Sequence, residues 1–352
     1  MPARMLLATA ALVAAWSFSA AARETTPGGA GQLKIVARGE AMQAGMADAF
    51  LQPFIEVTKI DAAGGSWDGG IETLRSQLKA TDNTWDLILV DTDELATGCG
   101  EGLFEKLDWS AIGGKDHYQQ QGVSECGVGG LVSNLVLAWD RDKFGATPGW
   151  ADFWDVAKYP GKRGLAKGVR GNMEIALLAD GVAQADIYRT LATTDGVDRA
   201  FRKLDQLKPY IVWWPTAAEA ARILASGDVL MTSAPSGVIA TASRQNTRNF
   251  GIQWNGSLYE LLSWAIAKGS PDLRSAQQFL YFTGMPAVEA RLLRLSGQVG
   301  VAKGVNDSLP PEFQAISPTS PVNIAGALRA DAGFWHDNEA KLRQRFDAWL
   351  GR

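Results

Sequence analysis

Short apolar runs alternate with amphipathic stretches along the first 90 residues of the chain. The apolar runs at residues 32–37 and 85–90 predict buried strands. Residues 42–57 and 71–79 carry apolar side chains at a spacing near 3.6, which predicts helices, and the glycine-rich residues 61–70 predict a loop. This alternation predicts an α/β protein with a mainly parallel sheet and helices on its faces.

The rest of the chain continues this mixed pattern. Residues 131–139 form an apolar run that could pass from one lobe into another, and residues 259–267 predict a strand that returns. Pro286 and Gly297 have the types common at the start and end of a helix. Further strands are expected at 210–214 and 229–232, and further helices at 147–158, 172–178, 198–207, 217–225, 286–296 and 334–350.

Three acidic residues, Asp91, Asp93 and Glu94, follow the apolar run 87–90. Burying charges at a strand end costs free energy unless they stay hydrated, form ion pairs or bind a ligand. In parallel α/β sheets, ligands bind beyond the carboxyl ends of the strands. We therefore expect Asp91 and Asp93 to contact the positive end of a solute. Glu94 is expected in the first turn of the next helix, where an acid suits the helix dipole.

Residues 1–22 have the layout of a secretory signal peptide. Arg4 precedes an apolar run from residue 5 to about residue 18, and small residues follow at 19–22. The run is shorter than the ~20 residues of a membrane span, although a retained N-terminal anchor is the alternative. We therefore expect an exported, periplasmic protein. The two cysteines, Cys99 and Cys126, are then expected to form a disulfide, with two free buried thiols as the alternative.

Charge and length narrow the class of protein further. Lysine and arginine number 34 against 38 aspartates and glutamates, which argues against nucleic acid as a partner. The mature chain is long enough for two lobes, because single cores stop growing near about 250–300 residues.

Motifs for catalysis, metals and cofactors are missing from the sequence. The two histidines, His117 and His336, lack neighbours at metal-ligand spacing. The chain has no nucleophile elbow, no P-loop and no dinucleotide fingerprint. We therefore expect no enzyme, no metal and no cofactor. An exported hydrolase or lyase is the alternative, favoured if a histidine lies beside an acid in the cleft. A ferric-ion carrier is disfavoured, because Tyr259 and Tyr281 are far apart in the sequence.

Five segments, in family order, resemble the periplasmic solute-binding proteins of ABC importers, in the spermidine/putrescine-binding group. They span residues 85–112, 131–166, 213–234, 258–292 and 334–350. The resemblance implies a type II-like periplasmic binding protein fold, with two lobes of mixed sheet and helices hinged by crossover strands. It implies one lobe from residues 27–137 plus 262–305 and a second from 138–261 plus 306–352. It also implies a monomer that captures a small solute and delivers it to an ABC permease.

The resemblance leaves the solute open between a polyamine and an ω-amino acid. Polyamine binders use acids and aromatics in the cleft, and Asp91 and Asp93 keep that acidic character. Other matching positions depart from the pattern: Val169 and Asn172 replace an acidic pair, Leu262 replaces an aspartate, and Ser233 replaces a tryptophan.

Two arginines favour a solute that also carries a carboxylate. Arg38 follows the first strand, and Arg170 precedes a predicted helix, whose N-terminus also favours anions. Together with Asp91 or Asp93, either arginine would suit a zwitterion, although Arg38 could equally be a surface residue. Trp67 is a candidate to stack on the solute or, alternatively, to anchor the lobe surface. The remaining candidates, from loops and strand ends expected at the cleft, are Glu40, Asn172, Trp214, Ser233, Ser236, Tyr259, Glu260 and Gln298.

Overall fold

The computed structural model describes residues 31–38, 45–80, 83–245 and 248–351. The expected signal segment and the candidate Glu40 lie outside these ranges. In the described part, nine strands form one sheet in the order β2-β1-β3-β8-β4-β7-β5-β6, with β9 paired to β8. The strands are β1 (Leu33–Arg38), β2 (Ala62–Trp67), β3 (Leu87–Val90), β4 (Gly127–Asp140), β5 (Arg163–Ala166), β6 (Ile211–Trp214), β7 (Met231–Pro235), β8 (Phe250–Ile266) and β9 (Leu328–Arg329).

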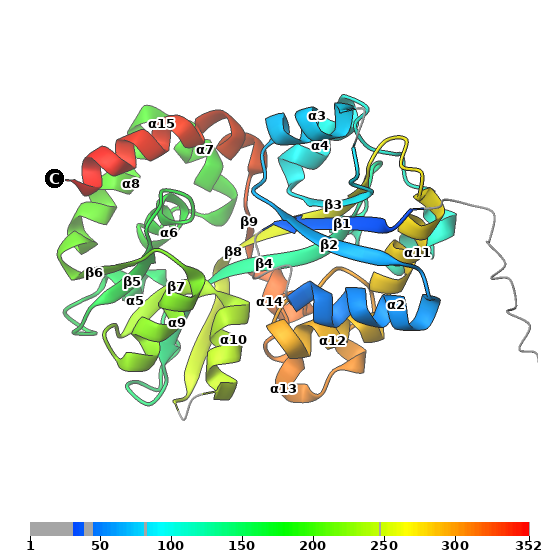
Figure 1. The fold of residues 1–352 in the computed structure, drawn as a ribbon. Helices are drawn as coiled ribbons and strands as arrows, with labels where there is room; N and C mark the ends of the chain where they lie inside the picture. Colours follow the sequence, from blue (N-terminus) through cyan, green and yellow to red (C-terminus); the bar gives the residue numbers. More distant parts are fainter. Residues whose placement is uncertain (1–30, 39–44, 81–82, 246–247, 352) are drawn as a thin grey trace, which may run out of the picture.

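The helices divide between two lobes that cover the two ends of this sheet (Figure 1). The first lobe, at the right of the figure, carries the π-helical turn η1 (Ala47–Leu51), α2 (Gln52–Thr58), α3 (Ile71–Lys79), α4 (Thr92–Gly100), α11 (Leu273–Thr283), α12 (Pro286–Ser296), α13 (Pro311–Gln314) and α14 (Pro321–Ala325). The second carries α5 (Trp150–Trp154), α6 (Asn172–Ala179), α7 (Ile187–Leu191), α8 (Thr194–Leu207), α9 (Ala217–Ser226), α10 (Ser236–Gln245) and α15 (Ala332–Leu350). Short 3₁₀ turns lie at Trp109–Ile112, Lys115–His117, Gln120–Gly122, Gln184–Asp186, Lys208–Tyr210 and Asn306–Ser308.

The strands β4 and β8 run from one lobe into the other. They pair antiparallel along most of their length, with Gly127 opposite Ala265 in the first lobe and Asp140 opposite Phe250 in the second. Both are longer than the expected 131–139 and 259–267, because each strand satisfies the backbone groups of the other. Parallel pairs flank them, β1 with β2 and β3, and β5 with β6 and β7. The expected mixed α/β fold of two lobes joined by crossover strands is confirmed.

Each lobe has its own hydrophobic core. Phe54, Trp264 and Phe279 lie in the first core, where Phe279 packs edge-on against both other rings. Trp139 and Phe153 lie in the second core. Two separate cores are what a chain of this length is expected to form.

The packing of residues 306–325 bears on the proposed lobe boundaries. Leu309 packs with Ala290 and Leu293 in the first lobe, and Phe313 lies against the same cluster. Only with α15 does the chain enter the core of the second lobe. We therefore propose a boundary near β9 rather than at residue 306.

Two local predictions were wrong. The glycine-rich residues 61–70 contain a strand, β2, because β1 offers a parallel edge; a side chain at Gly65 would lie 3.1 Å from Val36. The helix expected at 147–158 is confined to α5. The buried Arg163 donates to the carbonyls of Phe153 and Tyr159, both at 2.7 Å, and so satisfies backbone groups that a longer helix would use.

The predicted disulfide is confirmed. Cys99 near the end of α4 is bonded to Cys126, just before β4. The bond closes a segment with a sequence separation of 27 and ties α4 to the crossover strand.

Candidate ligand-binding site

The carboxyl ends of three first-lobe strands meet at one edge of the sheet. β1 ends at Arg38, β2 is followed by Asp68, and β3 is followed by Asp91. Across from them lies α15 of the second lobe, and the space between has a volume of about 720 Å³. We call it the α4–α15 groove; it is lined by Arg38, Asp68, Gly69, Gly70, Ile71, Asp91, Asp93, Glu94, Thr97, Arg170, Trp335, His336, Glu339, Ala340 and Arg343.

Arg38 is paired within the first lobe. Its Nη2 donates to Asp91 Oδ2 at 2.9 Å and forms a second ion pair with Glu94. Glu94, only 4% exposed, also accepts the backbone N–H groups of Gly70 (2.6 Å) and Asp91 (2.9 Å). The remaining oxygen of Asp91 accepts the N–H of Glu94 at 2.8 Å, which completes a capping box at the start of α4. Arg38 is thus shared by Asp91 and Glu94, and the chain itself supplies partners for all three side chains.

Trp67 is buried in a core cluster of the first lobe and is neither a surface anchor nor a groove residue. It is 5% exposed, its Nε1 donates to the carbonyl of Leu89 at 3.3 Å, and its ring packs edge-on against Trp85. Arg38 lies over the same ring, 5.5 Å from the centroid. Trp67 therefore supports Arg38 from beneath and does not line the groove.

Asp93 lines the α4–α15 groove and faces groups from both lobes. Partial burial and the charge of Asp91 raise the pKa of Asp93 to about 6, although His336 and Arg170 act in the opposite direction. His336 thus lies in a groove with an acid, the arrangement that we had set as favouring an enzyme. His117 instead contacts the carbonyl of Gly284 at 2.7 Å through Nε2 and packs against Tyr118.

A second, smaller cavity lies at the carboxyl ends of the second-lobe strands. Ala166 ends β5, Trp214 ends β6 and Pro235 ends β7, and all three line a space of about 230 Å³. We call it the β4–α6 cavity; it is also lined by Ser133, Asn134, Leu135, Arg170, Gly171, Glu174, Leu258, Glu260 and Ala330. Its place beyond the strand ends is where α/β sheets bind ligands.

Opposite charges and unpaired polar atoms meet in this cavity. Arg170 Nη1 lies 3.6 Å from Glu260 Oε1. Asn134 Oδ1 and Trp214 Nε1 are buried without a hydrogen-bond partner among the described residues, and so is Arg170 Nε. Buried polar atoms without partners are costly unless something else satisfies them. The cavity therefore offers both hydrogen-bond donors and acceptors to a small solute.

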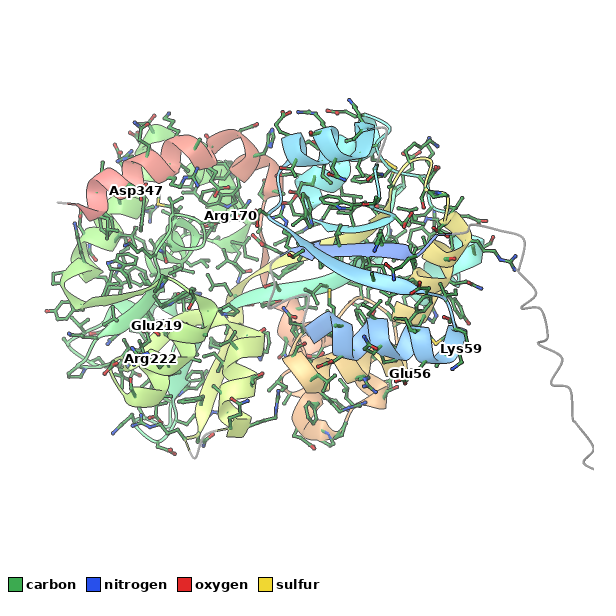
Figure 2. The ribbon with its side chains drawn as sticks, viewed as in Figure 1. Glu56, Lys59, Arg170, Glu219, Arg222 and Asp347 are labelled. Carbon is green, nitrogen blue, oxygen red and sulfur yellow. A yellow bond between two sulfur atoms is a disulfide. The ribbon has the colours of Figure 1, made fainter. Side chains whose placement is uncertain are left out.

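Arg170 is shared by the groove and the cavity. It lines both spaces, and Figure 2 labels it where the two lobes approach each other. Its Cζ lies 5.6 Å from the centroid of the Trp335 ring in α15. Of the sequence candidates, Arg170 thus has the most central position.

The other candidates line neither space. The amide of the fully buried Asn172 donates to the carbonyls of Ala166 (2.8 Å) and Gly168 (2.6 Å), so it braces the loop before α6. Ser233 is fully buried on β7, opposite Leu137. The others are Ser236, 3% exposed at the start of α10; Tyr259, a β8 residue that packs against the first core; and Gln298, in the loop after α12.

Sequence reasoning missed Asn134, Glu174 and Trp335. Asn134 carried a signal, because an amide in the middle of an apolar strand needs a partner. Glu174 and Trp335 are 161 residues apart, and Trp335 Nε1 donates to Glu174 Oε1 at 2.7 Å. No local sequence pattern predicts the Glu174–Trp335 pair, because only the packing of α15 brings the two residues together.

The described residues hold no group of three or more His, Cys, Asp or Glu arranged to bind a metal ion. None of the helices built from them is long and apolar enough to cross a membrane.

Two α/β lobes joined by crossover strands, with a polar cavity at the strand ends, define a solute-binding protein. Residues 45–317 match the family model described as bacterial extracellular solute-binding protein, and the chain belongs to this family. The expected resemblance to the solute-binding proteins of ABC importers is confirmed. Since the family consists of binding proteins, the chain is not an enzyme, and His336 is a groove residue rather than a catalytic one.

Individual relatives agree with this family. The chain is 39% identical over 337 residues to the gamma-aminobutyric acid (GABA)-binding protein of Pseudomonas aeruginosa, covering 96% of this chain and 94% of that protein. A solved GABA receptor structure matches with a TM-score of 0.78 at 28% identity, covering 91% of this chain and 98% of that one. An ABC transporter substrate-binding protein from Bradyrhizobium japonicum matches with a TM-score of 0.76 at 28% identity, covering 90% and 99%.

Proposed function

We propose that this protein captures an ω-amino acid, with GABA as the leading candidate, in the β4–α6 cavity and delivers it to an ABC permease. The observation that carries the proposal is the Arg170–Glu260 pair, whose charged atoms face each other at 3.6 Å in that cavity. A solute with one carboxylate and one ammonium group can replace this contact, its carboxylate pairing with Arg170 and its ammonium group with Glu260. The names of the GABA-binding relatives support the same class of solute.

The unpaired cavity atoms suit the two ends of such a zwitterion. Arg170 and the indole N–H of Trp214 are donors and match a carboxylate. Glu260 and Asn134 Oδ1 are acceptors and match an ammonium group. We therefore assign the carboxylate to the Arg170 side and the ammonium to the Glu260 side. Asp91 and Arg38 are left out of this assignment, because they are joined by a hydrogen bond of 2.9 Å, whereas Arg170 and Glu260 lie 3.6 Å apart.

A polyamine suits the cavity less well. It would bring a second ammonium group toward Arg170 and leave the Trp214 N–H without an acceptor. Like charges at close range and unpaired buried donors both cost free energy. We keep putrescine as the comparison ligand for the test.

Export to the periplasm belongs to the same proposal. The family is extracellular, and residues 1–22 have the layout of a signal peptide. We further propose that the protein acts as a monomer, which passes the solute to the permease.

Isothermal titration calorimetry with GABA, 4-aminobutanamide and putrescine tests the solute class. We expect GABA to bind most tightly, because only GABA carries both charges. Arg170→Gln and Glu260→Gln should each weaken GABA binding by about 10- to 100-fold, the range for a hydrogen bond to a charged group.

Arg343→Gln is the matched control, because Arg343 lines the α4–α15 groove but not the cavity. It should change GABA binding by less than about threefold. Tighter binding of putrescine than of GABA, or equal losses in all three variants, would contradict the proposal.

A further inference from the structure

We propose that Glu174 and Trp335 are positioning residues that hold the Arg170 guanidinium in place for the solute carboxylate. The inference rests on the proposed function and deepens it. It means that a residue of α15 influences which solute the protein prefers, although this helix contributes no residue to the β4–α6 cavity.

The first observation is the set of donors that converge on the Glu174 carboxylate. Its Oε1 accepts from Trp335 Nε1 (2.7 Å) and Tyr188 Oη (2.9 Å), and its Oε2 accepts from the backbone N–H of Gly171 (2.9 Å). Glu174 and Trp335 are both fully buried. Three donors on two oxygens suit an ionised carboxylate, because a glutamine would present its own N–H groups to at least one of these donors.

The second observation is the position of Arg170 over the Trp335 ring. Its Cζ lies 5.6 Å from the ring centroid, and its Nε is buried without a hydrogen-bond partner among the described residues. A guanidinium over an indole face is attracted by the negative side of the ring. The indole is itself fixed, because its N–H is bonded to Glu174.

These contacts form a chain from a buried anion to the proposed carboxylate-binding group. A hydrogen bond from the indole N–H to a carboxylate polarises the ring toward greater electron density, which strengthens its attraction for the guanidinium above it. Glu174 also lies one helical turn from Arg170 and caps α6 through Gly171. Arg170 is thereby seated on the Trp335 ring, with its Nη1 directed toward Glu260 in the cavity.

Charge balance supports the same role for Glu174. No Lys, Arg or His contacts the Glu174 carboxylate in the described part of the chain. Burial raises the pKa of Glu174, and its hydrogen bonds, including those from Tyr188, Trp335 and Gly171, act in the opposite direction by favouring the ionised form. Glu174 lines the same cavity as Arg170, and its hydrogen bond to Trp335 fixes the ring on which the guanidinium rests.

The preference for GABA over 4-aminobutanamide measures this positioning, because the two probes differ only in the charge that Arg170 would meet. Trp335→Leu removes both the ring face and the donor to Glu174. We expect it to reduce the preference by about tenfold or more, through weaker GABA binding, with amide binding little changed. A merely structural role would weaken both probes equally.

Phe334→Leu is the matched control. Phe334 packs against Trp335 and Tyr188 at the same end of α15, whereas among the described residues the ring beneath Arg170 and the indole donor to Glu174 both belong to Trp335. It should leave the preference unchanged. Should Trp335→Leu not fold, Trp335→Phe keeps an aromatic face without the donor, and a reduced preference in it supports the inference. An unchanged preference in the folded Trp335 variant overturns it.

A second measurement needs no solute and separates this inference from the proposed function. In ¹⁵N NMR of the ligand-free protein, the Arg170 Nε–H signal, assigned by its loss in Arg170→Lys, should be displaced upfield by the Trp335 ring. Trp335→Leu should abolish that displacement and Phe334→Leu should retain it. A signal that does not move in Trp335→Leu overturns the positioning role. Failure of GABA to bind, with the NMR result as expected, overturns the proposed solute alone.

Discussion

At the scale of single residues, three buried carboxylates are satisfied in three different ways. Glu94 is paired with Arg38, and Glu174 collects an indole, a phenol and a backbone donor. Glu289 on α12 has backbone donors, among them the N–H of Ala302 at 3.0 and 3.1 Å from its two oxygens. Burial without a cation raises the pKa of Glu289 to about 8. The same residue type is therefore stabilised by different partners in the three places, and burial raises the pKa of Glu174 as well.

Glu289→Gln is expected to remove a pH dependence of stability. The folded pKa of about 8 lies above the unfolded value of 4.5, so the folded state binds more protons between these values. The stability that this proton uptake adds to the folded state is fully present below pH 4.5 and is lost as pH rises through 8. At pH 8.5 the free energy of unfolding of the variant should therefore be higher than that of the wild type, by at most about 5 kcal/mol. At pH 5 the two free energies should be nearly equal.

Urea unfolding at pH 5, 7 and 8.5 measures this difference. Glu339→Gln, on the more open α15, is the control and should give a profile parallel to the wild type. Parallel profiles for Glu289→Gln as well would show that Glu289 does not titrate in this range.

At the scale of elements, α4 is held at both ends. Asp91 and Glu94 form a capping box at its start, and Cys99 near its end is bonded to Cys126. Arg38 crosses from β1 to the same helix start. The acids that begin α4 thus serve the helix and the strand beside it, which explains carboxylates at a strand end without a bound cation.

Asp91→Ala is expected to lower the free energy of unfolding by about 1–2 kcal/mol, because the helix start loses its cap. Asp91→Ser keeps a capping oxygen and should recover most of that loss, although it cannot pair with Arg38. Chemical denaturation of both variants measures the effect. Calorimetry with GABA on Asp91→Ser tests whether Asp91 also contacts the solute. A tenfold loss of affinity in this variant would show that it does.

At the scale of the whole molecule, the two lobes face each other across charged surfaces. Asp91 and Asp93 lie on the first-lobe side of the α4–α15 groove, and Arg170, His336 and Arg343 on the second-lobe side. Glu339 of α15 also lines the groove, and Asp331 adds a negative charge near Asp93. Arg38 also lies on the first-lobe side, so charges of both signs line both sides of the groove, and β4 and β8 connect the two lobes.

Asp93→Asn is expected to stabilise the protein at neutral pH. The folded pKa of Asp93, about 6, lies above the unfolded value of 3.8, so its contribution is present at low pH and lost as pH rises through 6. The variant should melt about 1–2 °C above the wild type at pH 7.5, roughly as for 1 kcal/mol in a chain of this size. The two should converge at pH 4.5. A difference that does not change with pH would mean that Asp93 ionises normally.

Local sequence patterns predict the candidate site residues of the two lobes to different extents. Asp91, Asp93 and Arg38 follow apolar runs, and so their place at strand ends in the groove was predictable. Their partners were not, because pairing across β1, β2 and α4 depends on distances that no local pattern contains. Arg170 was predicted from its place before a helix, whereas Glu174 and Trp335 depend on a contact across 161 residues.

The sequence by itself determined the α/β class, most of the helices and strands, the cysteine pair and the family resemblance, because periodicity and residue type report local conformation and burial. The tertiary structure decided that Arg38 is paired with an acid, that Trp67 lies in the core, and that Arg170 rests on Trp335 beside Glu260. The physical reason is that the free energy of a charge depends on its nearest partners, which only the folded chain brings together.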